Sequence, residues 1–184
     1  MRVISGEHKG RPLAAVPGKG TRPTTDKVKE SIFNIIGPYF DGGTALDLYA
    51  GTGGLGIEAL SRGIERTVFI DIEQKAISVI KQNLASLNLS DQAEVYRNDS
   101  DRALKVLAKR DIQFDLVFLD PPYAKQKLEA EMRLLQDLNL LAPGARIVTE
   151  HDTEFTLKET IGDCVQERSV TYGDTTISIF QFNS

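Results

Sequence analysis

The sequence predicts an α/β fold in which a mostly parallel sheet carries helices on both faces. Short apolar runs with strand character alternate with amphipathic helical segments between residues 45 and 150. A glycine-rich turn follows the first of these runs, and an acidic residue with two prolines follows the fourth. Because ligands bind at the carboxyl ends of strands in open α/β sheets, we expect the functional residues at these two turns. The length of 184 residues allows one domain with a sizeable core.

Regular elements are expected throughout this alternating region. Helices are predicted where apolar residues recur at three- and four-residue spacing, over 26–37, 54–62, 73–87, 101–108 and 126–138. Strands are predicted over 45–49, 67–71, 93–97, 114–119 and 145–150. Residues 165–172 and 175–182 then flank the tight turn Gly173-Asp174, which predicts a C-terminal hairpin with one strand antiparallel to the rest.

Residues 1–23 are predicted to form a basic arm ahead of a main domain over 24–184. Two strand-like pieces, 2–5 and 11–16, predict a small β-hairpin. Residues 1–30 carry seven basic and three acidic side chains, a net charge of +4. Because the whole chain has a net charge of −4, the remaining residues carry −8. A basic arm on an acidic body indicates an anionic partner, although a solvated terminal segment has the same composition. The candidate contacts to an RNA partner are Arg2, Lys9, Arg11, Lys19 and Arg22.

The first strand-to-helix turn runs from Asp47 to Gly56 and matches the pattern G-x-G-x-x-G. Gly51 and Gly53 permit tight turning and close approach of a ligand to the backbone, and Gly56 permits close packing of the helix on a strand. Asp71, at the end of the next strand, is placed to bind ribose hydroxyls. These residues alone leave a dinucleotide and S-adenosylmethionine both possible.

Two carboxylates favour S-adenosylmethionine at this turn. Asp47 lies four residues before the first glycine, where a carboxylate attracts the cationic amino acid end of that donor and repels a pyrophosphate. The alternative partners of Asp47 are nearby backbone N–H groups. Asp99 can accept a hydrogen bond from an adenine amino group, or instead cap the next helix. The predicted cofactor-binding residues are Asp47, Tyr49, Ala50, Gly51, Thr52, Gly53, Asp71, Ile72, Asn98, Asp99 and Ser100.

The second turn, Asp120-Pro121-Pro122-Tyr123, follows the buried run 114–119. Its two prolines fix φ and remove two backbone donors, which leaves a stiff loop with free carbonyls beside an aromatic ring. Acceptors next to an aromatic face suit a flat ring that bears an amine, so we expect methylation of an exocyclic amino group of a nucleobase. A structural turn with a packed tyrosine is the alternative. The predicted catalytic residues are Asp120, Pro121, Pro122 and Tyr123.

Composition excludes several other classes of function. No apolar run approaches the roughly 18 residues that a membrane span needs, and the N-terminus lacks the apolar core of a signal peptide. The single Cys164 forms no internal disulfide, which fits a reducing cytoplasm. With one cysteine, two histidines and no metal-ligand spacing, no metal site is predicted. A hydrolase is unsupported because the sequence has no Gly-x-Ser-x-Gly elbow.

Together these stretches resemble the RsmD family of small-subunit ribosomal RNA guanine-N2 methyltransferases, which are class I methyltransferases. The matching stretches extend over nearly the whole chain and are 2–6, 10–13, 22–30, 47–53, 56–63, 120–123 and 172–174. The resemblance implies a Rossmann-like sheet of seven strands with the last antiparallel. It also implies S-adenosylmethionine as the methyl donor, and 16S ribosomal RNA or an assembling small subunit as the partner. A monomer is expected.

For methylation of guanine N2, Asp120 and the carbonyl of Pro121 are expected to accept the two N–H bonds of the amino group, while Tyr123 stacks on the base. The target base must be unpaired or flipped out. Three other functions stay open: an adenine-N6 DNA or RNA methyltransferase with the same turn, a dinucleotide oxidoreductase, and a non-catalytic RNA-binding assembly factor. Deletion of residues 1–20 is expected to weaken RNA binding and to leave donor affinity nearly intact.

Overall fold

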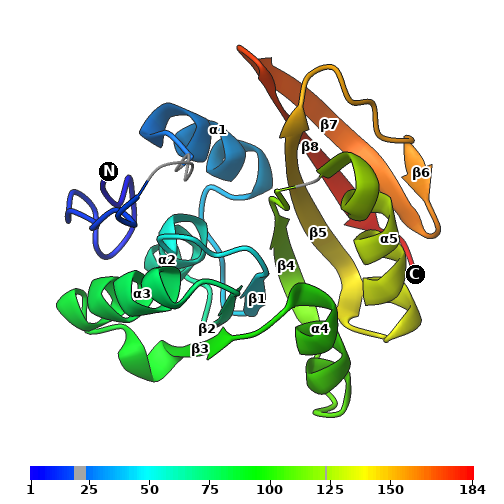
Figure 1. Ribbon diagram of the computed structural model, residues 1–184. Coiled ribbons are helices and arrows are strands. Elements are labelled where there is room, and N and C mark those ends of the chain that lie inside the picture. Colours follow the sequence, from blue (N-terminus) through cyan, green and yellow to red (C-terminus); the bar gives the residue numbers. More distant parts are fainter. Residues whose placement is uncertain (19–23, 123) are drawn as a thin grey trace. The chain divides into compact units, whose positions relative to one another are not determined.

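The computed structural model describes residues 1–18, 24–122 and 124–184 (Figure 1). The chain divides into two compact units, Met1–Ser100 and Asp101–Ser184. Among the predicted site residues, Lys19, Arg22 and Tyr123 lie outside the described residues. Within the described ranges, no helix is long and apolar enough to cross a membrane.

Three parallel strands form the sheet of the first unit, in the order β3-β2-β1. They are β1 (Thr44–Asp47), β2 (Arg66–Asp71) and β3 (Ala93–Arg97). Asp47 lies opposite Phe69, and Asp71 lies opposite Arg97, so the carboxyl ends of the three strands share one edge (Figure 1). The turns that follow these strands therefore meet at the edge where ligands bind in such sheets.

The helices of the first unit pack on this sheet or lead into it. α1 (Asp26–Ile36) begins where Oγ1 of Thr25 accepts the N–H of Val28 at 3.3 Å. α2 (Gly54–Ser61) contacts β1 and β2, and α3 (Gln74–Ser86) contacts β2 and β3. A single 3-10 turn, η1 (Ser90–Gln92), precedes β3. The apolar side chains of these elements, among them Leu46, Ile57, Phe69 and Ile80, are fully buried and form the core of this unit.

In the second unit the strand order is β4-β5-β8-β7-β6. β4 (Phe114–Leu119) and β5 (Leu141–Asp152) are parallel, and the remaining pairs are antiparallel. The remaining strands are β6 (Thr160–Ile161), β7 (Cys164–Tyr172) and β8 (Thr175–Phe182). The helices are α4 (Ser100–Ala108), which starts at the boundary between the units, and α5 (Ala124–Asp137). The predicted C-terminal hairpin is formed by β7 and β8.

The described strands depart from the sequence prediction most clearly in their number and in the start of β5. They number eight rather than seven, because the two-residue β6 pairs with β7 and was not predicted. β5 starts at Leu141 instead of residue 145. Pro143 and Gly144 are residue types common in loops, but the pairing of β5 with β4 continues across a register shift, which accommodates a residue without an N–H.

The predicted N-terminal hairpin is present only as a chain reversal. Its two regular strands are replaced by a single antiparallel bridge between Arg2 and Pro12. The N–H groups of Ile4 and Ser5 donate instead to the two carboxylate oxygens of Glu58, at 2.9 and 3.0 Å. Those amides are therefore satisfied by a side chain of α2, and no second strand is needed to pair them.

Candidate functional site

The turn after β1 is held by backbone hydrogen bonds. The N–H of Ala50 donates to the carbonyl of Ile70 at 2.9 Å, and the N–H of Gly53 donates to the carbonyl of Ala50 at 2.7 Å. Gly51 and Gly53 have φ angles of 56° and 82°, in the left-handed region that glycine adopts at little cost. The chain therefore reverses tightly and enters α2 at Gly54, as the glycine pattern predicts.

Gly56 allows α2 to lie directly against β2. A methyl group at this position is 2.4 Å from Cε1 of Phe69, so a larger residue does not fit without movement of the strand or ring. The predicted role of Gly56 in close helix–strand packing is confirmed by this distance. The same closeness brings the first N–H groups of α2 to the end of β1, where the N–H of Gly56 donates to Oδ2 of Asp47 at 3.1 Å.

Asp71 ties the glycine turn to the end of β2. Its Oδ2 accepts the N–H of Gly51 at 2.8 Å, and its Oδ1 accepts the N–H of Glu73 at 2.9 Å. The carboxylate is half-buried, and the next residue, Ile72, is 59% exposed. Asp71 is thus fixed in orientation next to the glycine turn, with an exposed apolar side chain beside it.

Asp47 is buried, with 3% of its surface exposed. Burial raises the pKa of Asp47 to about 7, because the charged form loses its hydration. The N–H of Gly56 opposes this rise by stabilising the carboxylate, and the nearby charge of Asp71 adds to it. A cation brought next to Asp47 removes the penalty, so this carboxyl is suited to respond to a positively charged ligand.

The turn after β3 joins the same edge. The N–H of Asn98 donates to the carbonyl of Asp71 at 3.1 Å, and Oδ1 of Asn98 accepts the N–H of Asp99 at 2.8 Å. The hydroxyl of Tyr49 donates to Oγ of Ser100 at 3.0 Å. The structure therefore brings the predicted cofactor-binding residues of β1, β2 and β3 together through direct hydrogen bonds.

Thr52 and Ala50 complete this edge from within the glycine turn. Oγ1 of Thr52 accepts the N–H of Gly54 at 3.2 Å, which satisfies one of the unpaired donors at the start of α2. Both Thr52 and Ala50 are buried, each with 7% of its surface exposed. Their side chains are therefore largely closed to solvent.

The predicted catalytic turn belongs to the second unit. β4 ends at Leu119, and the side chain of Asp120 is exposed between two buried residues, Leu119 and Pro121. Pro122 is exposed, and Tyr123 lies outside the described residues. A carboxylate is therefore presented to solvent at the carboxyl end of a buried strand, on backbone that two prolines stiffen.

The described members of the predicted RNA-binding set are exposed, but two of them already have partners. Nε of Arg2 lies 3.7 Å from Oδ2 of Asp26, in an ion pair that is largely exposed. A guanidinium nitrogen of Arg11 donates to the carbonyl of Ser86 at 2.8 Å. Lys9 is exposed as well. An exposed ion pair such as that of Arg2 is weak, so its charge stays accessible to phosphate.

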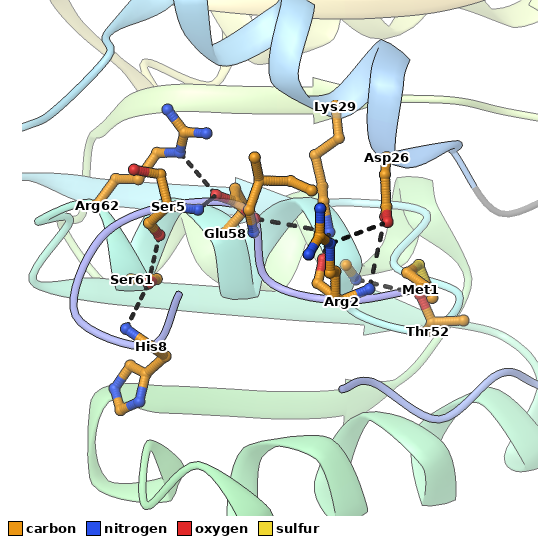
Figure 2. Close-up of polar contacts among 12 residues, drawn as sticks. Met1, Arg2, Ser5, His8, Asp26, Lys29, Thr52, Glu58, Ser61 and Arg62 are labelled. Carbon is orange, nitrogen blue, oxygen red and sulfur yellow. Dashed lines mark hydrogen bonds and ion pairs between the residues drawn. The ribbon is translucent and has the colours of Figure 1, made fainter. Parts of the chain in front are cut away.

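A buried charged cluster was not predicted from the sequence. Figure 2 shows Glu58 of α2 between Arg62 and Lys29. Nε of Arg62 donates to Oε2 of Glu58 at 2.7 Å, and Nζ of Lys29 lies 3.6 Å from Oε1. The three side chains are at most 2% exposed. A glutamate within an otherwise apolar helix is the signal that could have revealed this cluster.

The cluster holds the N-terminal segment, residues 1–16, against α1 and α2. Besides the two amides that Glu58 accepts, Nζ of Lys29 donates to the carbonyl of Arg2 at 2.7 Å. Burial lowers the pKa of Lys29, while the charges of Glu58 and Asp26 oppose that shift. The segment is therefore fastened through backbone groups bonded to buried side chains, which leaves its own basic side chains at the surface.

No group of three or more histidine, cysteine, aspartate or glutamate side chains in the described part of the chain is arranged to hold a metal ion.

A family model described as "Conserved hypothetical protein 95" matches residues 1–181. YlbH of Bacillus subtilis, named as a candidate rRNA methyltransferase, is 58% identical over 98% of this chain and 98% of its own length. The "Ribosomal RNA small subunit methyltransferase D" of Haemophilus influenzae is 39% identical over 84% of this chain and 80% of its own length. The solved structure of the candidate methyltransferase yhhF from Escherichia coli has a TM-score of 0.88 and 30% identity, and it covers 100% of this chain and 98% of that chain.

Proposed function

We propose that this chain, which belongs to the RsmD family of ribosomal RNA methyltransferases, transfers a methyl group to the N2 amino group of a guanine in small-subunit ribosomal RNA. The observation that carries the proposal is the exposed carboxylate of Asp120 on a proline-stiffened turn directly after a buried strand. Such a turn supplies a carboxylate and backbone carbonyls as acceptors for an amino group.

S-adenosylmethionine is the methyl donor, and it supplies a methyl group on a cationic sulfur. In the proposal, Asp47 faces the amino acid end of the donor and Asp71 binds its ribose. The backbone of Gly51 and Gly53 lies close to the donor, and Asp99 accepts from the adenine amino group. The linked hydrogen bonds among these turns support this assignment, because they fix the groups before the donor arrives.

On the acceptor side, Asp120 and the carbonyl of Pro121 accept the two N–H bonds of guanine N2. The nitrogen lone pair is then drawn out of conjugation with the ring and becomes nucleophilic. Tyr123 stacks on the base. Asp120 or a water molecule takes the proton that N2 loses once it carries the methyl group. This reaction depends on positioning more than on a catalytic pKa, which agrees with the use of a single carboxylate.

RNA is proposed to contact the basic side chains of the N-terminal segment and the stretch that follows it. Arg2, Lys9 and Arg11 are exposed there, and Lys19 and Arg22 extend the set along the sequence. Contacts to phosphate fix the register of an RNA without reading its bases. The guanine is unpaired or flipped out, because N2 within a duplex does not reach such a turn. We also propose that the protein acts as a monomer in the cytoplasm.

The test is transfer of labelled methyl from S-adenosylmethionine to unmodified small-subunit ribosomal RNA, to small subunits and to duplex DNA. The labelled base is identified after nucleoside digestion. We expect N2-methylguanine in a ribosomal substrate, and loss of transfer with Asp120→Ala. Asp115→Ala, at an exposed position in β4, is the matched control and is expected to keep transfer. Appearance of N6-methyladenine instead would contradict the proposed target.

A further inference from the structure

Asn83 of α3 connects two segments that are far apart in the sequence. Its Oδ1 accepts the N–H of Ala14 at 2.8 Å, and its Nδ2 donates to the carbonyl of Ala14 at 3.1 Å. The same Nδ2 donates to the carbonyl of Thr52 at 3.0 Å. Asn83 is 2% exposed. One side-chain amide thus pairs with the backbone of the N-terminal segment and also with that of the glycine turn, and it uses both of its donors.

A second contact links the same two segments. Oγ1 of Thr52 lies 3.9 Å from Sδ of Met1. Both residues are labelled in Figure 2. That hydroxyl accepts the N–H of Gly54 at the start of α2. Met1 therefore contacts Thr52 directly, and Ala14, near the other end of the N-terminal segment, is linked to Thr52 through Asn83.

The position of Thr52 gives these contacts a consequence for ligand binding. Thr52 lies between Gly51 and Gly53, two residues with positive φ and little conformational restraint of their own. Hydrogen bonds hold Gly51 and Gly53 on either side of Thr52, and a contact to Thr52 itself restrains the middle of the turn further. Asn83 supplies such a contact by fixing a carbonyl at the middle of the turn, and its amide is oriented for this bond by its two bonds to Ala14.

We propose that Asn83 is a positioning residue for the methyl donor: it fastens the N-terminal segment to the glycine turn, so that docking of the segment and binding of the donor are coupled. The inference rests on the proposed function, which places the donor at this turn. It differs from the expectation that loss of residues 1–20 leaves donor affinity nearly intact. With the segment gone, Asn83 loses two of its three bonds, and donor affinity is expected to fall.

The coupling has a reciprocal consequence for RNA. A ligand that holds the segment in its docked position strengthens donor binding, and the donor strengthens binding of that ligand by the same factor. RNA on Arg2 or Lys9 is such a ligand, because both residues belong to the docked segment. The enzyme then binds its donor more tightly when its substrate is present.

The test compares the full-length variants Asn83→Ala and Ser61→Ala. Oγ of Ser61 donates to the carbonyl of Ser5 at 2.7 Å and accepts the N–H of His8 at 3.0 Å, so this control loosens the same segment away from the glycine turn. Affinity for S-adenosylhomocysteine is measured by calorimetry at 25 °C. Amide hydrogen exchange of residues 50–54 is measured in the ligand-free protein, and melting temperatures are recorded.

We expect Asn83→Ala to weaken binding of S-adenosylhomocysteine about tenfold and to speed exchange in the turn, because it removes several buried hydrogen bonds. Ser61→Ala is expected to lower the melting temperature as well, yet to stay within about twofold of the wild-type affinity. If Asn83 only stabilised the fold, its removal would lower the melting temperature without weakening S-adenosylhomocysteine binding more than Ser61→Ala does. Unchanged affinity in folded Asn83→Ala, or equal weakening in both variants, overturns the proposal.

If Asn83→Ala does not fold, Ala14→Pro takes its place, since it removes the N–H that Oδ1 of Asn83 accepts and leaves Asn83 itself unchanged. A loss of about threefold in affinity is expected from one hydrogen bond, and no loss overturns the proposal. These measurements need no RNA. A chain that shows the Asn83 effect but methylates no ribosomal RNA refutes the proposed substrate alone, whereas a wild-type chain that does not bind S-adenosylhomocysteine refutes both.

Discussion

The buried carboxyl of Asp47 makes donor binding depend on pH. Its pKa is raised to about 7 chiefly by burial. If the cationic end of the donor binds only the ionised form, affinity scales with the ionised fraction, which is about one in eleven at pH 6 and about ten in eleven at pH 8 for such a group. The dissociation constant is therefore expected to be about tenfold larger at pH 6 than at pH 8.

Calorimetry with S-adenosylhomocysteine measures this directly. Titrations at pH 6 and pH 8, each in two buffers of different ionisation enthalpy, give both the affinity and the number of protons released. About 0.9 proton is expected to leave at pH 6 and about 0.1 at pH 8. Asp47→Asn is the control: it binds more weakly, and it retains only the pH dependence of the ligand's own groups. Equal pH dependence in the wild-type protein and this variant refutes the assignment of Asp47.

The same rise in the pKa of Asp47 makes the folded state less stable as pH rises, whereas donor affinity increases with pH. Because the folded-state pKa of Asp47 lies above its ordinary value of 3.8, its contribution to stability is fully present below about pH 4 and is lost as pH rises to about 7. The shift of about three pKa units sets a ceiling of roughly 4 kcal/mol on this loss. Asp47→Asn is thus expected to raise the free energy of unfolding at pH 8 and to have little effect at pH 4, as urea titrations measure.

Three further outcomes are expected. Glu58→Gln leaves two buried cations without their counter-ion and is expected to lower the free energy of unfolding by about 3–5 kcal/mol, as measured by urea titration. Glu94→Gln, in a partly exposed ion pair, is the control and is expected to lower it by less than about 1 kcal/mol. Equal losses in the two variants would contradict this. Gly56→Ala places a methyl group 2.4 Å from the ring of Phe69 and is expected to lower stability by about 1–3 kcal/mol in thermal melts, so an unchanged melt argues against this packing. Cys164 is fully buried and its pKa is raised to about 11, so iodoacetamide is expected to modify it only after unfolding; rapid labelling of native protein would refute its burial.

Sequence reasoning predicted the elements that carry local signals. β3 has its predicted bounds, and the glycine turn after β1 has the positive φ angles that its glycines suggest. Apolar periodicity and turn residues are local properties, so they are readable from one chain. β5 starts earlier than predicted, because the structure accommodates its proline and glycine, residue types common in loops, in a register shift.

The contacts that fasten the N-terminal segment were not predictable from the sequence. Glu58 and Asn83 lie on helical faces that bury mainly apolar residues, and among their partners are backbone groups of the N-terminal segment more than 50 residues away. A polar residue in an apolar stripe indicates a buried partner without saying which one. The expected hairpin is reduced to one bridge, and Glu58 accepts the N–H groups of Ile4 and Ser5 within the stretch where a strand was predicted.

The most direct test of the proposed function uses ribosomal RNA from cells that lack this protein. Nucleoside analysis of their small-subunit ribosomal RNA is compared with that of cells that regain the wild-type chain or Asp120→Ala. We predict that the content of N2-methylguanine falls by one residue per small-subunit RNA and is restored by the wild-type chain alone. Unchanged N2-methylguanine in cells without the protein, or full restoration by Asp120→Ala, would contradict the account.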